Sequence, residues 1–234
     1  MALEASQGTS VLETDLVRDE LFVTSPANAS SFYARHGKRA LDLLLGSVLL
    51  LLLSPVIAVL AALVTLTSGF PPFYAATRMG KDGRQFRMWK LRSMVRDADA
   101  VLQRWKEKGS EEGLVYFQSY KLQRDPRVTR LGGLMRKTSL DELPQLWNVV
   151  RGDMSLVGPR PVVEDELQEY GPHAPLFLSV RPGMTGLWQT HGRNGVDYPE
   201  RARLEIRYTT GVSLSGDAGI LIRTVGVLLR ANGL

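Results

Sequence analysis

The sequence contains no cysteine, and this absence excludes both disulfide frameworks and cysteine-ligated metal sites. Histidine is scarce as well: His36, His173 and His191 are far apart and lack metal-ligand spacing. The patterns G-x-G-x-x-G and G-x-x-x-x-G-K-[ST] are missing, so a dinucleotide fold and a P-loop have no support. Any metal ion should therefore be a hard ion held by oxygen ligands.

Acidic residues outnumber basic ones only at the N-terminus. Residues 1–34 carry five acidic residues and one basic residue, whereas the rest of the chain carries 28 basic and 19 acidic residues. A basic body favours anionic partners such as lipid headgroups, nucleotide diphosphates or nucleic acid. Residues 1–34 are rich in Ser, Ala, Thr and acids, so we expect a largely disordered tail with one short helix near residues 12–22.

Charge is absent from Leu43 to Thr77. As one straight helix, the apolar centre at residues 40–67 would be about 42 Å long, against a hydrocarbon core of about 30 Å. Ser54-Pro55 should interrupt it, because proline removes a backbone donor and disfavours helix at the preceding residue. The two limbs, each roughly 20 Å long, are too short to cross alone, and the Ser54 hydroxyl can bond a backbone group freed by the break.

Basic residues flank this apolar segment on both sides: Arg35, Lys38 and Arg39 before it, and Arg78, Lys81 and Arg84 after it. The positive-inside tendency would keep both ends cytoplasmic. A helix–break–helix over residues 35–70 that dips into one leaflet satisfies this tendency, and a single span does not. The alternative is an ordinary bitopic span with a proline kink, since proline is common in membrane helices.

The remaining part of the chain, residues 71–234, contains short patterned runs. Strand-like runs at 73–77 and 86–90 predict a β-hairpin, and helical patterns follow at 95–107 and 114–122. Frequent glycine further along predicts short helices, and residues 220–229 form an amphipathic helix that lies on a membrane or packs on the core. We therefore expect an α-rich α+β catalytic domain with a small β-hairpin and amphipathic interfacial helices.

The adjacent carboxylates Asp141 and Glu142 are the candidate catalytic group. Pro144 is favoured at the first position of a helix, so both acids should lie just before a helix N-terminus, which favours bound anions. Two carboxylates among fixed guanidinium groups suit phosphoryl chemistry, because one can attack phosphorus or hold a metal while cations neutralise phosphate oxygens. The structural alternative is a capping box, whose spacing Ser139 and Glu142 share.

Five cationic residues are candidates for binding phosphate: Lys90, Arg92, Arg136, Arg160 and Arg193. Arg160 is fixed between two prolines, which suits a bidentate contact. Alternation along the predicted strand places Lys90 and Arg92 on one face. Arg193 lies in a glycine-rich loop whose donors can converge on a diphosphate. For these strand, turn and loop residues the plain alternative is a solvated surface side chain.

Asp97 and Asp99 have the D-x-D spacing by which many glycosyltransferases hold a nucleotide-sugar metal. They fall in a charged helical run with no preceding strand, which favours a solvated helix face. A metal-dependent glycosyltransferase that releases UDP is nevertheless one alternative function. A non-enzymatic, membrane-anchored basic binding protein is another.

Together these segments resemble the monotopic bacterial phosphoglycosyl transferases, also called bacterial sugar transferases. The matching pieces are Ser54-Pro55, R-M-G-K-D-G-R-Q-F with W-K-L-R-S-M, the long block at residues 125–161 that contains S-L-D-E-L-P-Q-L-W-N and ends in G-P-R-P, and R-P-G-M-T-G-L-W-Q-T-H-G-R-N. The resemblance covers about residues 35–230, which is nearly the whole chain outside the tail.

The resemblance implies transfer of a hexose 1-phosphate from a UDP-sugar to undecaprenyl phosphate at the cytoplasmic face of the bacterial inner membrane. Asp141 would attack the β-phosphorus and release UMP, Mg²⁺ near Asp141 would neutralise the diphosphate, and Glu142 would support the site or assist the second attack. The family's phosphate-binding cations correspond to Lys90, Arg92, Arg136, Arg160 and Arg193. The resemblance implies membrane lipids and no nucleic acid as partners, and a homo-oligomer is left open.

The chain departs from the family pattern at a few positions. Ala75-Ala76-Thr77 stands where relatives tend to carry Gln, and Glu205 and Gly211 stand where Asp and Asn are usual. These departures leave the implied chemistry intact but weaken inference about the sugar and the C-terminal packing. The V-V-E-D-E-L-Q-E-Y stretch after Pro161 is most similar to members that begin exopolysaccharides with galactose or glucose 1-phosphate.

Overall fold

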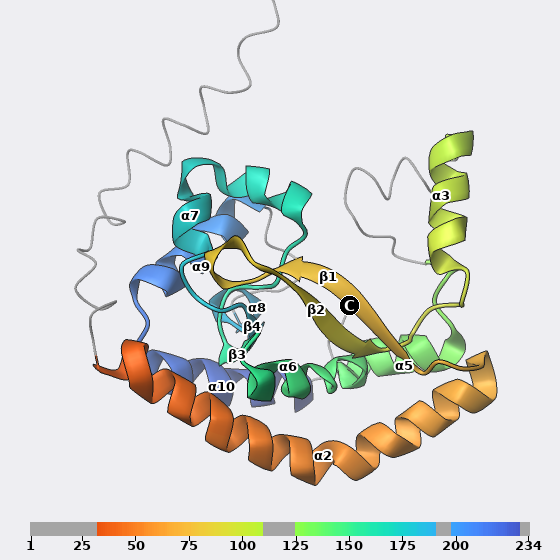
Figure 1. Ribbon diagram of the computed structural model, residues 1–234, viewed down its shortest axis with the longest axis horizontal. Coiled ribbons are helices and arrows are strands. Elements are labelled where there is room, and N and C mark those ends of the chain that lie inside the picture. The colour runs from red at the N-terminus through yellow and green to blue at the C-terminus, as the bar shows by residue number, and fades with distance from the viewer. Residues whose placement is uncertain (1–31, 110–124, 191–197, 230–234) are drawn as a thin grey trace, which may run out of the picture.

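The computed structural model describes residues 32–109, 125–190 and 198–229, in which helices predominate and strands form two small sheets (Figure 1). The helices are α2 (Lys38–Ser68), α3 (Ala98–Lys108), α5 (Arg130–Thr138), α6 (Gln145–Arg151), α7 (Ala174–Phe177), α8 (Leu187–Thr190), α9 (Tyr198–Thr210) and α10 (Leu214–Leu229). The strands are β1 (Phe73–Met79), β2 (Gln85–Leu91), β3 (Ser155–Val157) and β4 (Gly183–Thr185). This arrangement confirms the α-rich α+β class. The helices expected near residues 12–22 and 114–122 lie outside the described residues.

The predicted β-hairpin is present and longer than expected. Strands β1 and β2 pair antiparallel from Phe73 opposite Leu91 to Met79 opposite Gln85. Asp82 and Gly83 in the connecting turn both have positive φ, a conformation that glycine adopts without strain and aspartate tolerates. The second sheet pairs β3 with β4 in parallel. Its strand β3 is fully buried in a core shared with α6, α9 and α10.

Helix α2 is continuous through Pro55, so the predicted break in the helix is wrong (Figure 1). The Ser54 hydroxyl donates to the carbonyl oxygen of Leu51 at 2.8 Å, and Leu51 is the residue whose carbonyl Pro55 leaves without its helical donor. This local replacement lets the helix bend without unwinding. Figure 1 shows α2 as a single arc that bows away from the rest of the molecule, with both ends rising toward it.

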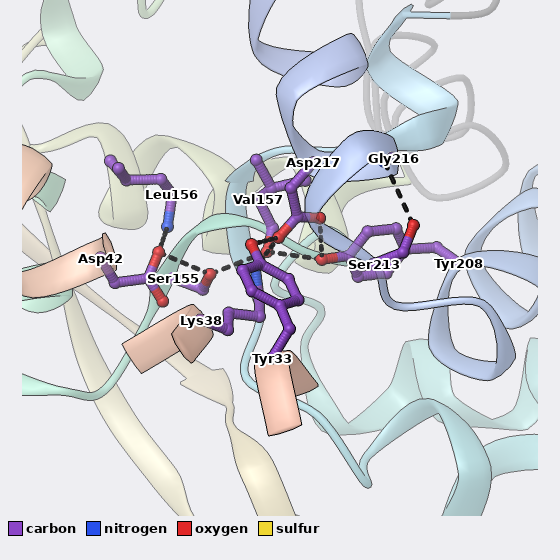
Figure 2. Close-up of polar contacts among 10 residues, drawn as sticks. All are labelled: Tyr33, Lys38, Asp42, Ser155, Leu156, Val157, Tyr208, Ser213, Gly216 and Asp217. Carbon is purple, nitrogen blue, oxygen red and sulfur yellow. Dashed lines mark hydrogen bonds and ion pairs between the residues drawn. The ribbon is translucent and has the colours of Figure 1, made fainter. Parts of the chain in front are cut away.

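The N-terminal end of α2 is bound to the domain through charged side chains (Figure 2). Asp217 of α10, only 1% exposed, accepts hydrogen bonds from Lys38 Nζ at 2.6 Å, from the Tyr33 hydroxyl at 2.6 Å and from the Tyr208 hydroxyl at 2.8 Å. Asp42, also buried, accepts from the Ser155 hydroxyl at 3.0 Å and from the Leu156 amide at 2.9 Å. Buried carboxylates need such partners, so these contacts fix this end of α2 in place.

Helix α2 also contacts α6 directly. Arg39 donates to the carbonyl oxygens of Val149 and Val150, at 2.6 and 2.8 Å, in the last turn of α6, where basic side chains commonly bind helix carbonyl groups. Seven residues later in α2, a Cβ on Gly46 would lie 3.0 Å from a methyl of Val149. Glycine therefore allows the two helices to approach closely at this point.

The C-terminal end of α2 is bound to the same domain. Arg92, which follows β2, donates to the carbonyl oxygens of Ser68 at 2.9 Å and of Gly69. Val64 is buried against Leu91 and Met135. Between the two bound ends the helix surface is largely exposed, including Leu51, which is 75% exposed. By length and composition, α2 with the helical turn before it is the one helix among the described residues that could cross a membrane.

Helix α10 contains the predicted amphipathic segment at 220–229 and begins six residues earlier, at Leu214. Ile220 is buried in the core, whereas Ile222 and Val225 are exposed. Exposed apolar residues also occur at Leu134 on α5 and Trp147 on α6. One face of α10 therefore packs on the core, and a second apolar face, which includes Ile222 and Val225, is exposed.

Candidate active site

The Asp-Glu pair lies in a short 3-10 turn, Leu140–Glu142, between α5 and α6. Ser139 ends α5 with a φ of 58°, and its amide donates to Arg136 and Met135 carbonyls. Pro144 directly precedes α6, so the expectation that both acids lie just before a helix is confirmed. The capping-box alternative is wrong, because the Ser139 side chain makes no capping bond in this turn and the Glu142 carboxylate contacts a lysine instead.

Asp141 is 6% exposed. Burial raises the pKa of its carboxyl above the ordinary value, and nearby Glu142 raises it further. Lys90 and Arg136 act in the opposite direction and lower this pKa by favouring the carboxylate. Asp141 is thus a poorly hydrated carboxyl group with two cations close by, an arrangement found at sites that attack or bind phosphate.

Lys90 and Glu142 meet across the site. Strand β2 supplies Lys90, whose Nζ lies 2.7 Å from Glu142 Oε1. Both side chains are partly exposed, so a ligand can reach them. The structure therefore brings together Asp141, Glu142 and Lys90 as the sequence predicts, and adds a direct ion pair that alternation along a strand does not reveal.

Arg136 is oriented by Ser93, a residue that the sequence analysis did not select. The Nε–H of Arg136 donates to the hydroxyl of Ser93 at 2.8 Å. Helix α5 lies so close to this point that a Cβ on Gly132 would be 1.9 Å from the Ser93 carbonyl oxygen. The sequence signal that could have identified Ser93 is its place in W-K-L-R-S-M, three residues after the end of the predicted strand at 86–90.

Arg92 takes a different position from Lys90. Its guanidinium is bound to the carbonyls at the end of α2, and burial followed by the nearby Arg96 lowers its pKa. Strand β2 ends at Leu91, so alternation along the strand does not extend to Arg92. Its contacts with Ser68 and Gly69 give Arg92 a structural role, and its binding of phosphate stays a prediction.

Arg160 belongs to a second cluster, formed with α8 and α9. Its backbone amide donates to Glu205 Oε1 at 3.1 Å, and its guanidinium lies 5.7 Å from the ring centre of Trp188. Glu205 is buried, which raises the pKa of its carboxyl, and it also accepts a hydrogen bond from the Tyr170 hydroxyl. The unusual Glu205 thus helps to hold the G-P-R-P turn, and Arg193 lies outside the described residues.

The oxygen donors at the site suit Mg²⁺. Among the described residues no group of three or more His, Cys, Asp and Glu side chains is placed to hold a metal. Mg²⁺ needs fewer protein ligands, because it is commonly bound by one or two carboxylates together with waters and substrate phosphates. Asp141, with Glu142 beside it, fits that pattern.

The D-x-D pattern on which the glycosyltransferase alternative depends lies at the exposed start of α3. Asp97 and Asp99 are exposed at the start of α3, and Asp97 lies 3.4 Å from Arg104 in an ion pair whose two side chains are more than half exposed. This is the solvated helix face that the sequence favoured. Such exposed pairs contribute little to stability.

Comparison with known proteins gives one consistent family. The profile described as "Bacterial sugar transferase" matches residues 33–231. The chain is 44% identical over 206 residues to the "UDP-galactose-lipid carrier transferase" of Erwinia amylovora, covering 88% of this chain and 43% of that protein. It is 44% identical over 196 residues to the "Exopolysaccharide production protein ExoY" of Rhizobium meliloti, covering 84% and 87%.

A third relative differs in the sugar it names. The "UDP-glucose:undecaprenyl-phosphate glucose-1-phosphate transferase" of Escherichia coli is 37% identical over 196 residues, covering 80% of this chain and 39% of that protein. The chain thus spans less than half the length of the Erwinia and Escherichia relatives, and most of the length of ExoY. The match over residues 33–231 includes every described site residue, and the chain belongs to the bacterial sugar transferase family.

Proposed function

We propose that this protein transfers a hexose 1-phosphate from a UDP-sugar to undecaprenyl phosphate and so initiates the assembly of an exopolysaccharide or another glycan. The observation that carries this proposal is the buried Asp141 carboxyl, with Lys90 and Arg136 beside it, in a chain of the bacterial sugar transferase family. The names of the relatives support the lipid phosphate acceptor and the UDP-linked donor.

The proposed reaction has two displacements at one phosphorus atom. The Asp141 carboxylate attacks the β-phosphorus of the UDP-sugar, forms a carboxylate–phosphorus bond and expels UMP as the bridging phosphorus–oxygen bond breaks. A phosphate oxygen of undecaprenyl phosphate then attacks the same phosphorus and releases the carboxylate. One phosphoanhydride replaces another, so the equilibrium is close to balanced and later steps must remove the product.

The side chains around Asp141 have distinct roles in this scheme. Lys90 and Arg136 neutralise phosphate oxygens as charge shifts toward the leaving UMP. Glu142, held by Lys90, supports the site or accepts a proton during the second attack. Mg²⁺, held by Asp141, would supply further charge neutralisation to the diphosphate when it is bound.

We propose that α2 enters one leaflet and returns, with the catalytic domain on the cytoplasmic face of the bacterial inner membrane. The support is that Lys38 and Asp42 bind one end of α2 to the domain while Arg92 binds the other. A helix whose two ends are attached to one face of a domain cannot place those ends on opposite sides of a bilayer. The exposed apolar middle of α2 needs a nonpolar environment, which the lipid supplies.

Galactose or glucose is the proposed sugar. Relatives from Erwinia amylovora and Salmonella typhimurium are named for galactose, and the Escherichia coli relative for glucose. A hexose epimer is distinguished by few contacts, so relatives with one site can differ in donor.

The test is to identify the nucleotide released by purified protein with Mg²⁺, undecaprenyl phosphate and separate UDP-sugars. We expect UMP with one donor, no turnover by Asp141→Asn, and more residual activity in Glu142→Gln. A single-turnover reaction with a sugar-labelled donor should leave label on wild-type protein and none on Asp141→Asn. Release of UDP would overturn phosphoglycosyl transfer, and ordinary turnover by Asp141→Asn would overturn the aspartyl intermediate.

A further inference from the structure

Asn148 is a polar residue in the most buried part of α6. Its side chain is 0% exposed, and the neighbouring helix residues Leu146 and Val149 belong to the hydrophobic core. An amide in such a place is costly unless all of its hydrogen-bonding groups have partners. Asn148 has them all, and two of the three partners belong to strand β2.

The carboxamide of Asn148 pairs with the backbone of β2. Its Oδ1 accepts from the Trp89 amide at 3.0 Å, and its Nδ2 donates to the Arg87 carbonyl at 2.8 Å. The second hydrogen of Nδ2 is directed to Asp153 Oδ2 at 3.1 Å. Because Trp89 offers a donor and Arg87 an acceptor, the backbone itself fixes which way the amide faces.

This pairing replaces a missing strand. In an antiparallel hairpin, Arg87 and Trp89 are two residues apart and point their peptide groups to the same edge. Strand β1 covers the other edge of β2, and the carboxamide of Asn148 covers this one as a third strand's peptide group would. The contact therefore sets the register between α6 and β2 at the residues on either side of Met88.

That register matters at the site, because Lys90 follows Trp89 directly and only two residues separate Glu142 from the start of α6. The 2.7 Å contact from Lys90 to Glu142 forms only if β2 and the start of α6 keep their relative position. We propose that Asn148 is a positioning residue for the transfer reaction, in which its carboxamide replaces a third strand on β2 and so places Lys90 opposite the Asp141-Glu142 turn. This inference rests on the proposed function.

The variant that tests it is Asn148→Leu, which has nearly the same shape, adds no charge and removes both bonds to β2. Ser155→Ala is the matched control, because Ser155 is also buried and its single O–H is directed to Asp42 Oδ1 and the Val157 carbonyl oxygen, away from β2. We expect Asn148→Leu to lower kcat for UMP release by about a hundredfold, the effect of a displacement of about 1 Å at a reacting group. Ser155→Ala should stay within about threefold of wild type.

The split between kcat and KM distinguishes positioning from general destabilisation. On the proposed mechanism Lys90 neutralises phosphate oxygens as charge shifts toward the leaving UMP. Displacing Lys90 in Asn148→Leu should therefore lower kcat and kcat/KM together and leave the KM for the UDP-sugar close to the wild-type value. A folded Asn148→Leu protein whose loss lies only in KM, or equal losses in both variants, would overturn the proposal.

A second variant and a hydrogen-exchange measurement keep the proposal testable if Asn148→Leu does not fold or if the protein shows no activity. If Asn148→Leu does not fold, Asn148→Ser replaces it, since its hydroxyl is too short to reach both backbone groups. Amide hydrogen exchange on wild-type protein tests the pairing without reference to activity: the Trp89 amide should be protected, and exchange at the rate of an unstructured peptide would refute the pairing. A wild-type protein that released no UMP would refute the proposed function but would leave this exchange result standing.

Discussion

Replacing Asp217 by asparagine should loosen the N-terminal end of α2 from the catalytic domain. Asp217 is the common acceptor for Lys38, Tyr33 and Tyr208 (Figure 2), and the Lys38 and Asp217 side chains are 13% and 1% exposed. Asparagine keeps the shape, but its single carbonyl oxygen can accept from only one of the two tyrosine hydroxyls, which donate to different carboxylate oxygens of Asp217. It removes the charge, however, and leaves a nearly buried ammonium group without its counter-ion.

The expected cost follows from this burial. Removing one partner of a buried ion pair typically costs 3–5 kcal/mol, and the one retained tyrosine contact and the unchanged shape place Asp217→Asn near the lower end, at about 3 kcal/mol. With an m-value of about 2 kcal/mol/M, the urea midpoint of the detergent-solubilised protein should fall by about 1.5 M. Circular dichroism of the helices is the measurement.

Two controls test the reasoning. Adding Lys38→Met to Asp217→Asn should recover most of the lost stability, because the unpaired charge is then gone. Glu200→Gln removes an exposed pair with Arg203 and should cost less than about 1 kcal/mol. A loss in Asp217→Asn no larger than that in Glu200→Gln, or a double variant as unstable as the single one, would refute the account of this buried pair.

Three other predictions concern the site. Asp141→Asn should lose turnover and yet be at least as stable as wild type near pH 8. The pKa of Asp141 is raised in the folded state, so ionising this group costs stability as pH rises through that pKa. Urea unfolding of both proteins at pH 5 and pH 8 checks this. The acid limb of wild-type kcat/KM should lie above the ordinary aspartate pKa of about 3.9, and a limb at or below it would contradict the effect of burial. Ser93→Ala should lower kcat about tenfold by releasing Arg136, whereas a threonine at this position should restore it; equal activity of both variants would remove Ser93 from the account.

Local chemistry in the sequence predicted the features that depend on neighbouring residues. The hairpin, the start of α6 after Pro144 and the bond from Ser54 to the carbonyl that Pro55 leaves free all follow from residues a few positions apart. No comparable local pattern indicates the Lys38–Asp217 pair, whose members are 179 positions apart, or the Asn148 contacts with β2.

The wrong prediction of a break in α2 also arose because contacts between distant residues cannot be inferred from local sequence. Proline predicts a local loss of one hydrogen bond, but whether the helix unwinds or only bends depends on what takes up the free carbonyl and on what holds the two ends. Ser54 supplies the first, and the contacts of Lys38 and Arg92 supply the second. The prediction for Arg92 was limited in the same way. Its sequence position indicates a cation near the end of the strand, but not that the carbonyl oxygens at the end of α2 bind it.

The attachment of α2 at both ends has a kinetic consequence on the proposed topology. A domain held at two points cannot swivel on a flexible stalk, so Asp141 keeps one height above the lipid headgroups. The lipid phosphate then reaches it by lateral diffusion within a plane, and the relevant concentration is the number of lipid acceptors per unit of bilayer area. Adding inert phospholipid at constant total acceptor should therefore slow the enzyme by surface dilution, even though the bulk concentration of every reactant is unchanged.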